Sequence, residues 1–167
     1  MFGDGDCFFR AVLEVAGPHV RARLGLTESD GLGDVIKKMR AATATELTDH
    51  PERYAAHIGG VGAGTSVAAL ASDIRIRGNY ANLAGDVTPW IASELLGLRL
   101  RIVTPTYEVS MGPENGVPVT LVQLTNGPLH FLAGVPQSPP AATVAVSSSL
   151  ADVAFDILTG RNKGTVR

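Results

Sequence analysis

Cysteine is almost absent from this chain, because among 167 residues only Cys7 carries a thiol. A single cysteine excludes an internal disulfide and a thiolate metal cluster. The four histidines, His19, His50, His57 and His130, are not spaced as the paired ligands of a helical zinc site. We therefore expect no metal and no cofactor. Without further context, a lone cysteine is more often an inert core residue than a nucleophile.

A surplus of charge and long apolar runs are also lacking. The net charge is −2, and basic clusters such as Lys37, Lys38 and Arg40, or the tail 161–167, are typical of solvated surfaces. We therefore expect no nucleic-acid partner. No apolar run reaches the ~20 residues of a membrane span, and the start MFGDGDC lacks the regions of a signal peptide. Neither a membrane segment nor a signal peptide is expected.

What remains is the composition of a globular domain, with 45% hydrophobic residues and a length that can bury a core. Apolar periodicity and turn signals predict helices over 7–15, 29–47, 49–58, 66–75 and 88–96. Strands are predicted over 98–102, 117–124 and 129–133. Helices followed by strands indicate an α+β fold, with a small, mainly antiparallel sheet flanked by helices. Residues 1–135 form the predicted domain; 136–167 are a Pro/Ser-rich segment and a short terminal helix, packed on the domain or trailing from it.

Three dipeptides define the predicted boundaries. Gly17-Pro18 predicts the end of the first helix, because proline cannot continue the hydrogen-bond ladder. Thr88-Pro89 predicts a helix start, with the hydroxyl as N-cap and proline in the first turn. Asn126-Gly127 predicts a tight hairpin turn between the last two strands.

Cys7 stands where a helix start would make a thiol reactive. The preceding run Gly3 to Asp6 favours a turn, and the partial positive charge of a helix N-terminus makes a thiol there easier to ionise. Glycine at position 5 lets the backbone N–H groups of this loop approach a substrate carbonyl and form an oxyanion hole. The pattern predicts a nucleophile, with Gly5 and Asp6 in the loop beside it.

His130 is the best candidate for the base that such a thiol needs. It lies in the short apolar run 129–132 on a predicted strand, whereas His19 follows a Gly-Pro turn and His50 and His57 have polar surroundings. On pattern alone, a histidine in an apolar strand is more often a core residue. An early cysteine and a late histidine on a strand are nevertheless the order of a catalytic dyad.

The run 3–11, GDGDCFFRA, resembles the nucleophile signature D-G-x-C-[FL]-[FWY]-R-[AS] of the ovarian-tumour (OTU) deubiquitinases at every position. Two weaker blocks follow in the family's order. Residues 85–103 resemble its helix and following strand, and the sequence LHF at 129–131 is similar to its His-aromatic pair. The chain is identified from these blocks, over residues 3–135, as a member of the OTU family of cysteine proteases.

The resemblance implies a papain-like OTU fold with the nucleophile at a helix N-terminus. It gives Cys7 the role of nucleophile, His130 that of general base and Asp4 that of the signature aspartate. The family's usual polar partner two residues from the histidine is replaced by Leu132 or Pro128. Asp4 and Asn126 are the remaining candidates for the third group, and a dyad without one is the alternative.

The implied substrate is ubiquitin or a ubiquitin-like protein, cleaved after its C-terminal Gly-Gly. Gly78, Asn79 and Tyr80 are expected to form a wall of the narrow cleft. Two alternatives stay open: a papain-like amidase or peptidase acting on another protein, and a catalytically silent OTU fold that binds ubiquitin. The Ala/Gly/Arg-rich composition resembles bacterial members carried as domains of large secreted proteins, and such a domain would act in the cytoplasm of a host.

Overall fold

The structure is a computed structural model that describes residues 5–58, 66–76, 83–124 and 130–134. The chain divides into two compact units, Met1–Pro136 and Gln137–Arg167. All described residues belong to the first unit. The helix predicted near the C-terminus and the turn predicted at Asn126-Gly127 lie outside the described residues.

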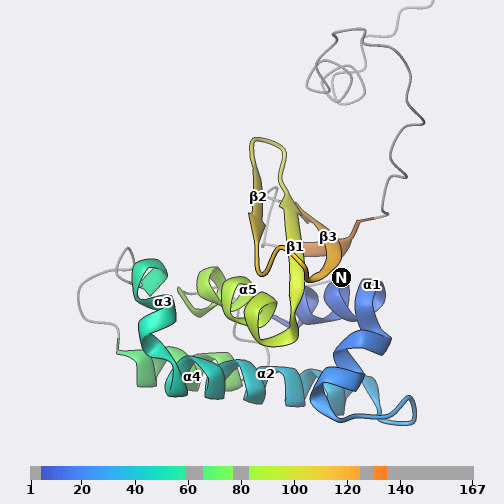
Figure 1. Ribbon diagram of the computed structural model, residues 1–167, viewed down its shortest axis with the longest axis horizontal. Helices are drawn as coiled ribbons and strands as arrows, with labels where there is room; N and C mark the ends of the chain where they lie inside the picture. Colours follow the sequence, from blue (N-terminus) through green and yellow to red (C-terminus); the bar gives the residue numbers. More distant parts are fainter. Residues whose placement is uncertain (1–4, 59–65, 77–82, 125–129, 135–167) are drawn as a thin grey trace, which may run out of the picture. The chain divides into compact units, whose positions relative to one another are not determined.

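The described part of the first unit holds five helices and four strands, an α+β arrangement as predicted (Figure 1). The helices are α1 (Cys7–Leu24), α2 (Leu32–Asp49), α3 (Pro51–Ile58), α4 (Val67–Arg75) and α5 (Leu83–Leu96). The predictions over 29–47, 49–58 and 66–75 are confirmed within a few residues. Ser66 caps α4, since its hydroxyl accepts a hydrogen bond from the Ala69 N–H at 3.1 Å.

The predicted end of the first helix at Gly17-Pro18 is wrong, because α1 continues to Leu24 through a kink. Ala16 has non-helical torsion angles (φ −129°, ψ 26°), and helical geometry then resumes. The kink removes the clash of Pro18 with the carbonyl four residues earlier, so the proline bends the helix without ending it. Core packing stabilises the second half of α1, since Val20 there is fully buried.

The predicted start of the last helix at Thr88-Pro89 is also wrong, because α5 begins at Leu83 and both residues lie inside it. Thr88 does not cap the helix; its hydroxyl donates to the Ala84 carbonyl one turn earlier. Ala84 and Val87 are buried in the core. Tertiary packing of this first turn therefore overrides the local signal for a helix start.

The sheet is mixed and has the order β2-β1-β3-β4. Its strands are β1 (Leu98–Val103), β2 (Glu108–Met111), β3 (Val117–Leu124) and β4 (His130–Ala133). The pairs β1–β2 and β3–β4 are antiparallel, but the longest pairing, β1–β3, is parallel, with Leu98 opposite Val117. The prediction of a mainly antiparallel meander therefore needs correction at the centre of the sheet, and the short strand β2 was missed.

This strand order requires the segment 112–116 to pass from β2, across the start of β1, to β3. The passage is tight: a Cβ on Gly112 would lie 2.0 Å from the Leu98 carbonyl oxygen, and one on Gly116 2.7 Å from the Arg99 nitrogen. Gly112 also has φ +87°, which only glycine adopts readily. The Val117 N–H closes the connection by donating to the Gly97 carbonyl at 2.9 Å.

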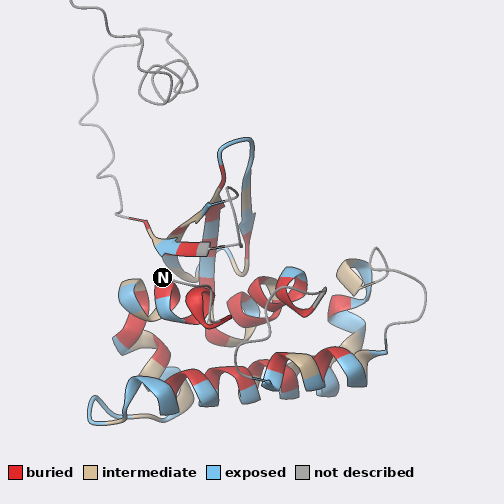
Figure 2. Cartoon of the chain, turned by 180° about the vertical axis from the view of Figure 1, so that it is seen from behind, coloured by how far each residue is buried: buried red, intermediate tan, exposed pale blue. Residues whose placement is uncertain are grey.

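Two hydrophobic clusters share the core. The first contains α1, the sheet, the start of α2 and the end of α5; the second contains α3, α4 and the opposite halves of α2 and α5. α5 lies between the sheet and α2 (Figure 1), and the buried positions of α2 face α5 while its outer side is exposed (Figure 2). Among the described residues, no helix is both long and apolar enough to cross a bilayer.

Candidate active site

Cys7 is the first residue of α1 and is almost enclosed, with 7% of its surface exposed. The helix begins as the Arg10 N–H donates to the Asp6 carbonyl at 2.9 Å, so Asp6 is the N-cap residue. The thiol therefore belongs to the first turn, where the N–H groups lack carbonyl partners within the helix and the helix dipole favours negative charge. This is the position that the sequence predicts for the nucleophile.

The loop before Cys7 is held by a buried ion pair that the sequence analysis missed. Arg40 of α2 and Asp6 have side-chain exposures of 2% and 0%, and their closest N–O distance is 2.8 Å. The same guanidinium donates from Nη2 to the Gly5 carbonyl at 2.6 Å. The interpretation of Arg40 as part of a solvated surface is therefore wrong, although its neighbours Lys37 and Lys38 are exposed.

A signal for this pair was present in the sequence. Arg40 is four residues after Ile36 and next to Met39, so helical periodicity places it on the same buried stripe of α2. A charged residue at such a position needs a buried partner of opposite charge. Asp6, predicted as part of the oxyanion loop, supplies it: Arg40 Nε donates to Asp6 Oδ1 at 2.9 Å.

Contacts between α1 and β4 bring the neighbours of the predicted dyad together. The rings of Phe8 and Phe131 meet edge to face, with centroids 5.4 Å apart. Phe8 follows Cys7 and Phe131 follows His130, the first residue of β4, which lies opposite Leu124 of β3. The backbones that carry the predicted nucleophile and base are thus on packed, adjacent elements. Phe8 is fully buried at this contact.

The other three histidines have contacts elsewhere. His19 Nε2 donates to the Leu96 carbonyl at 2.8 Å and so binds the C-terminal end of α5. The His57 ring stacks on Trp90 at 4.1 Å. His50 is a surface residue, with 42% of its side chain exposed. None of these positions suits a base for Cys7, and His130 remains the candidate.

Several predicted site residues lie outside the described residues. They are Asp4, Asn126, Gly78, Asn79 and Tyr80, so the third group and the cleft wall stay predictions. In the described part of the chain, no three His, Cys, Asp or Glu side chains are grouped as metal ligands would be.

One cavity lies beside β4. It has a volume of about 210 Å³ and is formed between α5 and the sheet, with Asp86, Trp90, Tyr107, Gln123 and Phe131 among its lining residues. Phe131 connects it to the strand of the predicted base. This cavity could not be predicted from the sequence, because its walls come from α5 and from all four strands, which are separate in sequence.

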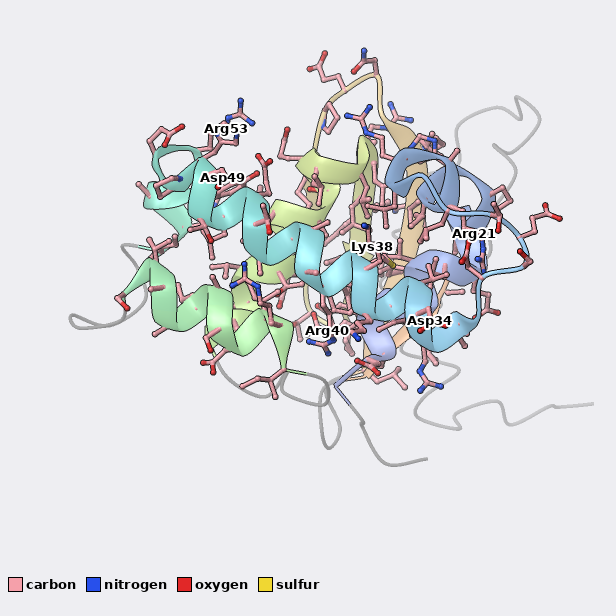
Figure 3. The ribbon with its side chains drawn as sticks, turned by 90° about the horizontal axis from the view of Figure 1, so that it is seen from below. Arg21, Asp34, Lys38, Arg40, Asp49 and Arg53 are labelled. Carbon is pink, nitrogen blue, oxygen red and sulfur yellow. The ribbon has the colours of Figure 1, made fainter. Side chains whose placement is uncertain are left out.

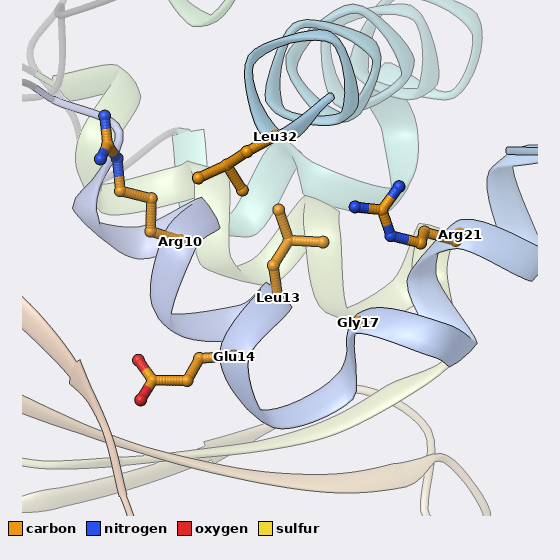
Figure 4. Close-up of a pocket in the computed structure, with 6 residues that line it drawn as sticks. All are labelled: Arg10, Leu13, Glu14, Gly17, Arg21 and Leu32. Carbon is orange, nitrogen blue, oxygen red and sulfur yellow. The ribbon is translucent and has the colours of Figure 1, made fainter. Parts of the chain in front are cut away.

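A second cavity, of about 330 Å³, follows the kink of α1 (Figure 4). Leu13 and Leu32 face each other across it, and Arg21 extends toward them. The Arg21 guanidinium is held by the Thr27 and Asp30 carbonyls at 2.8 and 3.0 Å. Its lining includes neither Cys7 nor any described residue of β4, so it is separate from the candidate site.

No model of a known protein family matches the chain, and no curated protein matches it.

Proposed function

We propose that this chain has a papain-like OTU fold and is a thiol-dependent hydrolase. Its substrate is the isopeptide or peptide bond after the C-terminal Gly-Gly of ubiquitin or a ubiquitin-like protein. One observation carries the proposal. Cys7, the only thiol, begins α1, and the next residue, Phe8, packs against Phe131, which follows His130. The nucleophile signature at residues 3–11 gives the substrate class.

The reaction has two stages. The Cys7 thiolate attacks the glycyl carbonyl, and backbone N–H groups of the loop 4–7 stabilise the oxyanion. His130 then donates a proton to the departing lysine amine, leaving a thioester on Cys7. Water, deprotonated by His130, hydrolyses the thioester and restores the thiol. Asp4 or Asn126 holds the imidazole in the required tautomer, unless the dyad acts alone.

The decisive experiment uses a ubiquitin carrying a C-terminal electrophile. We expect covalent modification of the wild type and none of Cys7→Ala, because the chain has no second thiol. Cys7→Ala with an unchanged melting temperature is the matched control for folding. Each alternative has its own outcome.

A folded wild type that binds ubiquitin without modification would support the silent module. A wild type that reacts with a small electrophile but with no probe of the ubiquitin-like class would support a peptidase or amidase acting on another protein. Either result would overturn the proposed substrate.

A further inference from the structure

The Arg40 side chain donates hydrogen bonds from all three nitrogens of its guanidinium group. A guanidinium carries five N–H groups in one plane. Nε and Nη2 bind Asp6 and the Gly5 carbonyl, and Nη1 donates to the Ile74 and Ile76 carbonyls at 2.9 and 3.2 Å. Arg40 extends from α2 to the beginning of α1 and the end of α4 (Figure 3). One side chain therefore joins three segments that are far apart in sequence.

The ring of Phe9 lies against the Arg40 guanidinium. The Arg40 guanidinium carbon lies 4.8 Å from the Phe9 ring centroid, a cation–π contact, and Phe9 is fully buried. The four hydrogen bonds and this contact together hold the guanidinium in one orientation. Lysine has three donors on a flexible stem and cannot reproduce this pattern.

Arg40 thereby sets the orientation of the backbone just before Cys7. Its bond to the Gly5 carbonyl fixes the Gly5–Asp6 peptide, whose N–H points away from that carbonyl because the peptide is planar and trans. Gly5 has φ +67°, the conformation that turns this peptide. The Asp6 carboxylate binds Arg40 and makes no side-chain capping bond to the first turn of α1.

We propose that Arg40 is a positioning residue for Cys7. It holds the loop whose N–H groups receive the oxyanion, and it ties that loop to the C-terminal end of α4. It touches neither substrate nor reacting atoms. The inference rests on the proposed function in taking Cys7 as the nucleophile, but not on the identity of the substrate.

The test measures the alkylation of Cys7 by iodoacetamide, because this readout needs no knowledge of the substrate. Rates are compared at one pH and at a temperature well below the melting point of each variant. We expect Arg40→Lys to slow alkylation by about 10- to 100-fold, the scale of a small misplacement of a reacting group. A structural role alone would lower the melting temperature and leave this rate unchanged.

Arg101→Lys is the matched control, because Arg101 also holds a carboxylate with two bonds, from Nε and Nη2 to Glu108 at 2.7 Å each, but is exposed. Its alkylation rate is expected to stay within about twofold of the wild type. If Arg40→Lys does not fold, the double variant Asp6→Asn/Arg40→Gln removes both buried charges together and is measured instead.

The ubiquitin electrophile separates this inference from the proposed function. If Arg40→Lys slows both reactions, and lowers kcat more than it raises KM with a cleavable ubiquitin substrate, both stand. If Arg40→Lys slows alkylation but the wild type does not react with the ubiquitin probe, the proposed substrate is wrong and the positioning role stands. A folded Arg40→Lys variant with alkylation as fast as, or faster than, the wild type would overturn the positioning role.

Discussion

At the scale of single residues, the histidines divide into those with structural contacts and the predicted base. His130→Ala should lower turnover of a ubiquitin substrate by at least about 100-fold, the usual effect of losing a general base. His19→Ala should lose about 1 kcal/mol of stability, because the Leu96 carbonyl loses its donor, and should keep its turnover. Steady-state kinetics and thermal melts of both variants measure this contrast.

His50→Ala serves as the control, since it changes a surface histidine. Its kinetics and melting temperature should match those of the wild type. Equal loss of turnover in the His19 and His130 variants would mean that the base was assigned to the wrong histidine.

Ionisation of Tyr54 should lower the stability of the fold at alkaline pH. The Tyr54 hydroxyl donates a hydrogen bond to the Glu46 carboxylate at 3.1 Å. Burial of the phenol and the negative charge of Glu46 raise the pKa of Tyr54 above its ordinary value of 10. In the unfolded chain this phenol ionises near pH 10. The neutral form is therefore favoured by folding, and its stabilising contribution is present below pH 10 and lost as the pH rises further.

Tyr54→Phe should accordingly be less stable than the wild type by about 1 kcal/mol near neutral pH. Above pH 10 the difference should shrink, because the variant has no buried phenol to ionise. Urea denaturation across this pH range measures it, with exposed Tyr107→Phe as the control. A difference independent of pH would contradict this account.

At the scale of elements, the crossing from β2 to β3 should tolerate no side chain at Gly112. We expect Gly112→Ala to lose at least about 2 kcal/mol in the free energy of unfolding, from its positive φ and from contact with the Leu98 carbonyl. Gly17→Ala is the control, because nothing lies within 4 Å of a Cβ there. A methyl group in helical backbone should stabilise by up to about 1 kcal/mol. Equal effects at both positions, measured by chemical denaturation, would argue against a steric cause.

The elements themselves were largely predictable, and their connections were not. Apolar periodicity, together with cap and turn residues, located α2, α3, α4, β1 and β3. The boundary at Thr88 failed, since packing of the turn before it outweighed a capping signal. The parallel pairing of β1 with β3 could not be read from alternation, which indicates burial but not the neighbouring strand.

The candidate site divides in the same way. A local motif indicated Cys7, and its place at the start of a helix followed from the turn before it. Arg40 was missed because its partners, Asp6 and the end of α4, are 34 or more residues away in sequence. The cluster of Arg40 with Lys37 and Lys38 suggested that Arg40 is exposed to solvent. The helical period of the apolar residues in α2 indicated instead that Arg40 is buried, and the structure agrees with the period.

At the scale of the whole molecule, α2 and α5 contribute to both hydrophobic clusters, and Arg40 joins segments from each. We therefore expect the described domain to unfold in one cooperative step. Far-ultraviolet circular dichroism reports the helices, and the single tryptophan, Trp90, reports the contact of α5 with α3. Both signals should give the same midpoint in urea. Two separate midpoints would show that the clusters unfold independently.

The position of β1 between β2 and β3 has a consequence for synthesis on the ribosome. The hairpin β1–β2 is complete once Met111 has emerged, and it is closed by the bonds between Thr104 and Tyr107. The other edge of β1 stays open until β3 follows, and an open edge can pair with another chain. His130 emerges later still, so Cys7 is translated long before its predicted base. A nascent chain would therefore carry the thiol without a partner histidine on β4 while all the segments between the two residues are added.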